Sequence, residues 1–200
     1  MTDRPQLHVS ALDMLWRCVI QYVRRYVFGE KLPPTIVQVV GHGDDEGVNR
    51  NLQHKIDTQN LLDVDEVRTI ARDKVVHDTE GEGVALMTAE EEQLGERAVI
   101  QQGIDKAVRL VEAHAVHLAP ILQPAAVQVK WTIDIPESEQ WPAIDFHLAG
   151  QKDLVETDRT VRDLKTTAKT PPRHAVDLSD QLTMYALDSL VNEGALPPRV

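Results

Sequence analysis

The chain has 200 residues, of which 42% are hydrophobic and 26% charged, and its formal net charge is −11 at pH 7. This length fits one domain or most of a larger one, and no apolar run approaches the roughly 20 residues that cross a bilayer, so we expect no membrane span. Such an acidic chain excludes a protein that coats itself with nucleic acid through many Lys and Arg contacts, but not an enzyme that binds DNA locally through metal ions and a few cations.

Cysteine usage and the first residues indicate the compartment. A single cysteine, Cys18, excludes an internal disulfide and suits a reducing environment. The stretch from Met1 to Ser10 is polar, unlike the apolar centre of a signal peptide. We therefore expect a cytoplasmic protein; the sequence identifies no protein partner.

The first predicted element is an amphipathic helix. Ser10, with Asp13 three residues later, resembles a capping box, and apolar residues recur at helical spacing as far as Gly29. The pair Pro33-Pro34 then interrupts the pattern. The helix is expected to bury its apolar stripe in the core.

A second helix is predicted after this break. A short apolar run over 36–40 leads into a stretch rich in glycine and acids, 41–47. Apolar residues four apart follow from Glu46 onward, which indicates a helix that begins there. Asp45 and Glu46 are then expected in its first turn.

Two further helices are predicted, over 64–76 and over 89–118. The second opens with a capping box formed by Thr88 and Glu91. Each glycine inside a helix costs about 1 kcal/mol relative to alanine, which weakens the prediction at Gly95 and Gly103. Between the two helices, the acidic and glycine-rich residues 78–83 are expected to form a mobile connection.

After Pro124 the hydrophobic period changes from 3.6 to 2, which indicates strands. Alternation over 127–135 predicts a half-buried strand, and residues 136–142 predict a turn. A partner strand is expected over 144–155, with a bend near Gly150. After another turn, a third strand is predicted over 161–165.

A last helix, capped by Asp177 or Ser179, is predicted to run to about Val191. The order of elements predicts an α/β fold in a single domain that covers the whole chain. Its first part, 10–122, is mainly helical, and its second part, 123–200, carries the strands.

Chemistry-bearing residues gather around the last hairpin. Residues two apart in a strand face the same side, so Asp163 and Lys165 project together while Leu164 points into the core. Asp153 joins them only if it lies opposite Asp163. That pairing requires an odd number of loop residues, for example 157–159, or a bulge, because a two-residue loop would place Asp153 opposite Leu164.

With this register, two carboxylates from adjacent strands form an all-oxygen ligand set, which Mg²⁺ or Mn²⁺ prefers. Such an ion polarises a phosphate and lowers the pKa of a bound water. Lys165 is placed to orient that water or to offset charge in the transition state. The residues therefore predict metal-dependent hydrolysis of a phosphodiester.

The same residues carry a resemblance to a known family. Asp153 followed by Asp163-Leu-Lys165 resembles the signature of the PD-(D/E)XK nuclease superfamily, and Gln181 with Tyr185 resembles the QxxxY motif of its RecB-like branch. The segment 10–29 is similar to the opening helix of this family. The second, metal-ligating helix of the family has counterparts at Gly41, Asp45, Asn51, Leu52 and Lys55.

The resemblance implies a restriction-endonuclease-like fold, with a mixed sheet, flanking helices and an N-terminal helical portion. It implies that Asp153 and Asp163 ligate Mg²⁺ or Mn²⁺, that the backbone carbonyl of Leu164 completes the shell, and that Lys165 is catalytic.

Two further site residues and the substrate follow from the resemblance. Gln181 and Tyr185, four apart and therefore on one face of a helix, are expected to support the site or to contact DNA. The partner implied is DNA, as single strands or duplex ends. The implied activity is that of a deoxyribonuclease, an exonuclease of recombination and repair or of phage DNA processing.

The third metal ligand departs from the family pattern. Where many relatives have a histidine in the second helix, this chain has Asp45 with Glu46 beside it. Alignment favours Asp45 as the ligand, and Glu46 is the second candidate. Alternatively, both acids are helix N-terminal residues stabilised by the macrodipole.

Other departures concern two single residues and the end of the chain. Lys152 stands where relatives have an apolar residue, and its charge is expected to act on the phosphate or on the neighbouring carboxylate. Cys18 matches the early cysteine of relatives that bind an iron–sulfur cluster, but no later cysteine follows, so we expect no cluster. Relatives continue into another core strand where this sequence ends, at 196–200, so truncation and an uncovered sheet edge are expected.

Two other functions compete with the nuclease. A nuclease-fold DNA-binding or interaction protein with a decayed site would keep the fold and lose metal binding, and the complete set of Asp153, Asp163 and Lys165 argues against it. A purely structural interaction protein would explain the acidity, but not the strands that deliver these three residues in order.

Overall fold

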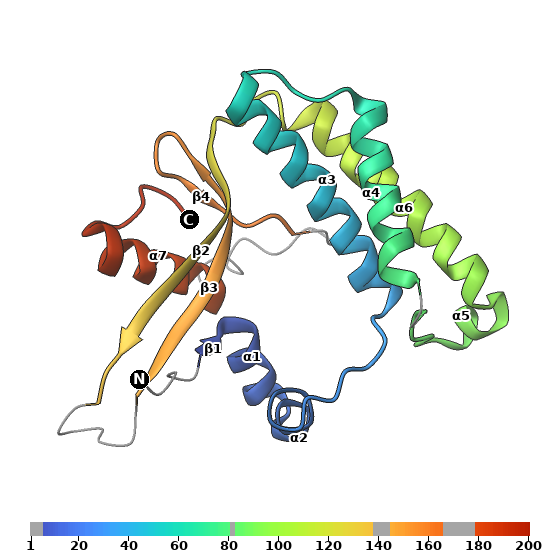
Figure 1. Cartoon of the computed structure of the whole chain (residues 1–200), viewed down its shortest axis with the longest axis horizontal. Coiled ribbons are helices and arrows are strands. Elements are labelled where there is room, and N and C mark those ends of the chain that lie inside the picture. Colours follow the sequence, from blue (N-terminus) through green and yellow to red (C-terminus); the bar gives the residue numbers. More distant parts are fainter. Residues whose placement is uncertain (1–5, 81–82, 138–144, 166–178) are drawn as a thin grey trace. The chain divides into compact units, whose positions relative to one another are not determined.

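The computed structural model describes residues 6–80, 83–137, 145–165 and 179–200 (Figure 1). The chain divides into two compact units. The helical unit comprises residues 32–127 and 164–168, and the sheet unit comprises residues 1–31, 128–163 and 169–200. Each unit has its own hydrophobic core. Within the described ranges, no helix is both long and apolar enough to cross a membrane.

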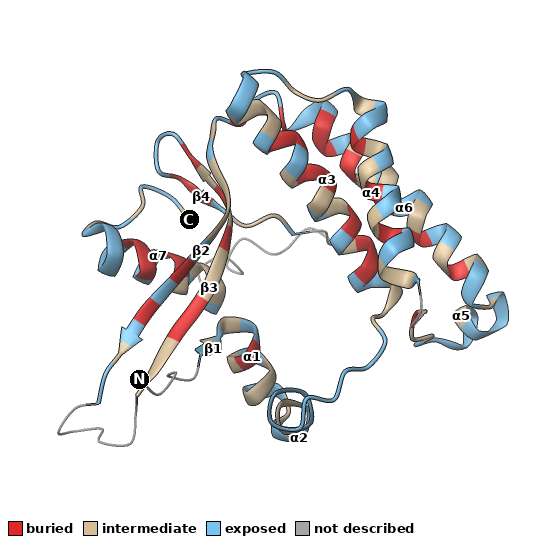
Figure 2. Cartoon of the chain, viewed as in Figure 1, coloured by how far each residue is buried: buried red, intermediate tan, exposed pale blue. Residues whose placement is uncertain are grey.

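Three long helices build the helical unit, and a short one precedes the last of them: α3 (Ile36–Thr58), α4 (Val64–Thr79), α5 (Ala89–Leu94) and α6 (Glu96–His117). The helices α3, α4 and α6 lie side by side (Figure 1), and each carries a stripe of buried residues (Figure 2). Small and β-branched side chains form their shared core, which contains Val39, Val40, Val75, Val84, Val99 and Ala107.

The helix α3 is continuous where a glycine-rich entry was predicted. It begins at Ile36 because Thr35 and Gln38 form a capping box. Gly43 and Gly47 lie inside it because neighbouring helices approach closely there. A Cβ at Gly43 would lie 2.7 Å from Val75 Cγ2, and one at Gly47 would lie 2.5 Å from Val111 Cγ2. These glycines permit helix packing and do not mark a helix start.

Asp45 and Glu46 therefore lie in the middle of α3, about three turns from its N-terminus. The prediction that they occupy a first turn was wrong. The explanation by the helix macrodipole was therefore wrong as well, because the macrodipole acts mainly on the terminal turns. Glu46 Oε1 accepts a hydrogen bond from Arg50 Nε at 2.9 Å.

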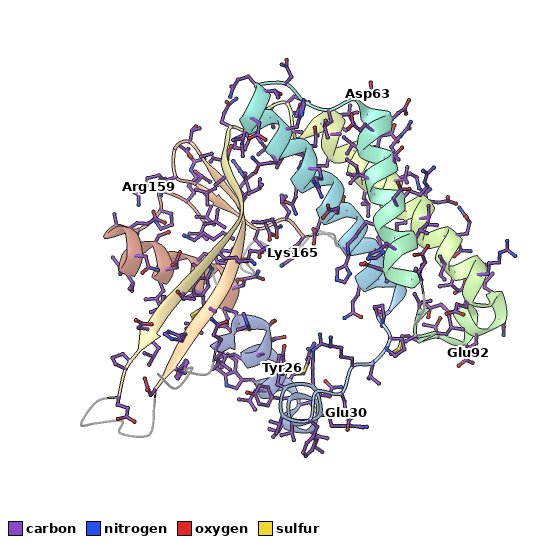
Figure 3. All side chains as sticks on the ribbon, viewed as in Figure 1. Tyr26, Glu30, Asp63, Glu92, Arg159 and Lys165 are labelled. Atoms are coloured by element: carbon purple, nitrogen blue, oxygen red, sulfur yellow. The ribbon has the colours of Figure 1, made fainter. Side chains whose placement is uncertain are left out.

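The other helical predictions held more closely. The helix over 64–76 is confirmed as α4, which Asp63 caps by accepting from the Asp65 amide at 2.8 Å (Figure 3). The helix predicted over 89–118 is two helices, which meet at Gly95. Its φ of +81° ends α5, a conformation that glycine adopts readily. The predicted connection, 78–83, begins inside α4, and residues 81–82 lie outside the described residues.

Two residues of α3, which match positions of the metal-ligating helix of the family, form hydrogen bonds near the ends of other helices. Asn51 is fully buried, and its Oδ1 accepts from the Leu62 amide at 2.9 Å, just before α4 begins. Lys55 Nζ donates to the carbonyl of Ala119 at 2.8 Å and to that of Leu122 at 2.6 Å, beyond the end of α6. The Lys55 ammonium thereby ties α3 to the segment that follows α6.

His114 gives the helical unit a pH dependence. Its residue is 7% exposed, and neither ring nitrogen has a hydrogen-bond partner among the described residues. Burial lowers the pKa of His114 from 6.5, so the folded chain resists a proton that the unfolded chain accepts. The free energy of unfolding is therefore expected to fall below about pH 6.5, by at most about 1.4 kcal/mol per pH unit.

Urea unfolding followed by circular dichroism at pH 7.5 and pH 5.5 measures this contribution. His114→Gln should flatten the difference between the two pH values. His117→Gln on the same helix is the matched control because His117 is exposed. If the two variants retain the same pH dependence as the wild type, His114 is not its source.

The sheet unit contains a mixed four-stranded sheet with strands β1 (Gln6–His8), β2 (Pro124–Ile135), β3 (Phe146–Glu156) and β4 (Val161–Arg162). β3 is the central strand, and it pairs with each of the other three. Its pairing with β1 is parallel, and its pairing with β4 is antiparallel. The helices of this unit are α1 (Val9–Arg17), α2 (Val19–Tyr22), the π-helical turn η1 (Val23–Val27) and α7 (Asp180–Glu193).

The sequence prediction of this unit was right in outline and wrong in several details. The helix predicted to reach Gly29 breaks at Cys18, whose backbone is extended (φ −160°, ψ 102°). The predicted capping box at Ser10 is absent, since α1 begins at Val9 with no side-chain cap on the described His8. The strand β1 was not predicted. Ser179 caps α7 as expected, and Asp177 lies outside the described residues.

The core of the sheet unit joins the sheet to α1 and α7. Its buried members are Trp131, Ile133, Leu148, Val161 and Tyr185. The last residues of the chain lie beside β4, where the Val161 amide donates to the Arg199 carbonyl at 3.0 Å. Tyr185 carries a hydroxyl at its tip, and it leads to the candidate site.

Candidate active site

The hairpin between β3 and β4 has the register that the predicted site requires. Leu154 pairs with Arg162, and Val155 pairs with Val161. The same register, continued by one residue past the end of β4, would set Asp163 opposite Asp153. Directly opposed residues of antiparallel strands project from the same side of the sheet, so the register favours convergence of the two carboxylates.

A three-residue loop sets this register. The Glu156 amide donates to the Thr160 carbonyl at 2.9 Å, which leaves Thr157, Asp158 and Arg159 in the loop. Arg159, at the tip of the hairpin in Figure 3, has a φ of +69°, the left-handed conformation that ends a three-residue hairpin loop. Asp158 Oδ1 accepts from the Thr160 amide at 2.8 Å, and this bond lowers the pKa of the Asp158 carboxyl.

Tyr185, on α7, links the helix to one of these acids. Its hydroxyl lies 2.8 Å from the carbonyl oxygen of Gln151 and 3.3 Å from Asp163 Oδ1. Gln181, one turn earlier, donates from Nε2 to the same hydroxyl at 2.5 Å. Gln181 therefore contacts the Tyr185 hydroxyl, and that hydroxyl in turn contacts Asp163.

The protonation state of Tyr185 follows from its surroundings. Burial raises its pKa most, and the negative charges of Asp163 and Asp153 raise it further. The hydroxyl therefore stays protonated at neutral pH and acts as a donor, not as a base.

The chemistry of these donors fits a hard divalent cation. Asp153 and Asp163 carry carboxylate oxygens, the ligand type that such an ion prefers. The described ranges contain no cluster of three or more His, Cys, Asp or Glu side chains that could hold a metal. Two carboxylates suffice for Mg²⁺, which commonly retains waters and is held by one or two carboxylates together with substrate phosphates.

The end of the motif differs from the prediction. β4 ends at Arg162, so the predicted strand over 161–165 is shorter, and strand alternation does not place Lys165. Leu164 is half-buried and Lys165 is exposed (Figure 3). Both follow Asp163 directly in the chain and group with the helical unit. Asp45 also belongs to that unit and is exposed on α3.

Lys152 has a different place from the one expected. Its side chain is 2% exposed, and its Nζ lies 2.6 Å from Asp188 Oδ2 and 2.8 Å from Ser189 Oγ on α7. Glu193 Oε1 is a third partner at 3.2 Å. Neighbouring strand residues face opposite sides, so the expected action of Lys152 on the phosphate was wrong.

This cluster of Lys152, Asp188, Ser189 and Glu193 was missed by the sequence analysis. Ser189 and Glu193, four apart, share a face of the helix, but Asp188 is turned about 100° from Ser189, so spacing alone does not mark the cluster. Arg159 Nη2 also contacts Glu193 Oε2, at 3.1 Å. Desolvation by burial raises the pKa of Glu193, but the hydrogen bonds from Arg159 and Lys152 outweigh it, so the pKa is lowered overall. The cluster fixes α7 against β3.

Comparison with known proteins identifies the family of the chain. The model of the PD-(D/E)XK nuclease superfamily matches residues 6–198. No curated protein matches the chain, and no solved structure does. The match spans nearly all of the chain, including the hairpin acids and the helix that contacts them, and the chain belongs to the PD-(D/E)XK nuclease superfamily.

Proposed function

We propose that this protein is a Mg²⁺- or Mn²⁺-dependent deoxyribonuclease that hydrolyses phosphodiester bonds of DNA. The observation that carries the proposal is the hairpin register, which sets Asp153 opposite Asp163 while Asp163 contacts Tyr185. Family membership supplies the reaction class.

The proposed roles follow the chain. Asp153, Asp163 and the backbone carbonyl of Leu164 would hold the cation, which when bound would polarise the scissile phosphate and lower the pKa of a bound water. Lys165 orients the attacking water or offsets charge in the transition state. The Tyr185 hydroxyl donates its proton to the Gln151 carbonyl or to the Asp163 carboxylate, which both lie within hydrogen-bond distance.

Gln181 supports this arrangement from the same helix, since its amide donates to the Tyr185 hydroxyl. Support by Gln181 keeps the tyrosine oriented while substrate enters. As a third metal ligand we propose Asp45 rather than Glu46. This choice rests on the resemblance of the second helix.

We further propose an exonuclease of the RecB-like branch, acting on single strands or duplex ends in recombination, repair or phage DNA processing. The QxxxY pair, Gln181 and Tyr185, supports this branch. Both units are proposed to form one nuclease domain, and the single cysteine supports a cytoplasmic location.

The test uses end-labelled linear duplex, linear single strands and covalently closed circles, each with Mg²⁺ or Mn²⁺. An exonuclease should degrade the linear forms and spare the circles. Lys165→Ala is the control because an exposed side chain can be removed with little effect on stability.

Equal degradation by the wild type and by Lys165→Ala would point to a contaminating nuclease and contradict the proposal. DNA binding without cleavage by the wild type would favour the decayed-site alternative. Cleavage of circles would retain the nuclease and exclude a strict exonuclease.

A further inference from the structure

The sheet unit contains a cavity of about 790 Å³ beside the candidate site. Its walls come from β1, the start of α1, the middle of β2 and β3, and the N-terminal turns of α7. Its volume lies within the roughly 300–1,000 Å³ of small-molecule sites. All of the lining residues belong to one unit.

The cavity reaches Tyr185, whose hydroxyl lies 3.3 Å from Asp163 Oδ1. Gln151 and Gln181 also line the cavity, and both are hydrogen-bonded to that hydroxyl, Gln151 as an acceptor through its carbonyl and Gln181 as a donor through its side-chain amide. A nucleotide whose phosphate lies at Asp163 therefore has its sugar and base next to the cavity.

Aromatic surface is available inside it. Trp131 is 6% exposed and lies against Gly150, where a Cβ would come within 2.3 Å of Trp131 Cζ2. The missing side chain at Gly150 thus leaves room for the indole. Trp16, on α1, also lines the cavity and is 66% exposed, which is unusual for so large an apolar side chain.

The charges of the lining favour a base over a phosphate. The cationic candidates, His8 and Lys130, are matched by the acids Asp13 and Asp180. A cavity without excess positive charge does not attract phosphate strongly. Aromatic and amide groups suit an uncharged, planar, hydrogen-bonding ligand.

We infer that this cavity is a nucleobase subsite, which takes the base of a nucleotide next to the scissile phosphate and stacks it on Trp16. The inference rests on the proposed function for the identity of the substrate. It assigns to α1 a direct role in binding the strand, in addition to its role in the core.

The test measures binding without hydrolysis. A fluorescein-labelled hexathymidylate is titrated with protein in EDTA at low salt, and Kd is read from fluorescence anisotropy. A matched oligonucleotide with abasic sugars keeps every phosphate and lacks the bases. It is expected to bind at least about fivefold more weakly, which is the lower end of base–aromatic stacking.

Two variants locate the binding. Trp16→Leu should raise the Kd of the thymidylate at least about fivefold and leave that of the abasic strand unchanged. Phe28→Leu is the matched control, because Phe28 is 69% exposed in the same unit and does not line the cavity. The cavity is refuted as a base subsite if both oligonucleotides bind equally, or if Trp16→Leu behaves like Phe28→Leu.

The binding experiment and the nuclease assay can fail independently of each other. Base-dependent binding without cleavage retains the subsite and removes the proposed function. Cleavage of DNA without base-dependent binding retains the function and removes the subsite.

Discussion

Asp163→Asn is expected to abolish both the cation response and DNA hydrolysis. The amide keeps the size of Asp163 and an acceptor for Tyr185, but it loses the negative charge that the cation needs. Loss of several kcal/mol of transition-state stabilisation corresponds to about a thousandfold fall in rate. Thermal unfolding with and without Mn²⁺ measures the binding separately from the chemistry.

The wild type should gain about 2.7 kcal/mol at a Mn²⁺ concentration one hundred times its Kd, and the variant almost nothing. Glu137→Gln is the matched control. It removes one negative charge from an exposed position of the same unit, after β2. A Mn²⁺ response in Asp163→Asn equal to that of the wild type would remove Asp163 from the metal site.

Lys152→Met is expected to produce the largest loss of stability. It leaves the carboxylate of Asp188, which is 5% exposed, buried without its cation, and breaking a buried ion pair in this way costs about 3–5 kcal/mol. The Asn192 amide, at 2.6 Å, compensates only in part. Urea unfolding followed by tryptophan fluorescence reports on this unit, which contains Trp16 and Trp131.

The double variant Lys152→Met/Asp188→Leu should recover most of the loss, because an apolar pair of similar size replaces a buried ion pair at little cost. Lys130→Met, at an exposed position of β2, should change stability by less than about 0.5 kcal/mol. If Lys152→Met is as stable as Lys130→Met, the cluster does not hold α7 against β3.

Local patterns in the sequence were sufficient for the parts of the fold that local interactions decide. The caps of α5 and α7, the period-2 strand β2 and the loop of 157–159 follow from neighbours in the chain. The length of α3 did not, because Gly43 and Gly47 look like helix breakers until Val75 and Val111 are seen against them.

The candidate site was predictable to a similar degree. The opposition of Asp153 and Asp163 follows from counting loop residues, since strand alternation has a period of two. The contact of Tyr185 with Asp163 and the burial of Lys152 depend on how α7 packs on the sheet. No spacing along the chain encodes that packing.

The odd length of the β3–β4 loop has a consequence for sequence drift. Losing or gaining a single codon in this loop would shift β4 by one step and turn one acid away from the other, even though the sheet could still form. Changes of two codons would conserve the parity. In lineages that descend from this chain, the length of the loop is therefore under tighter selection than the identity of the exposed residues in it.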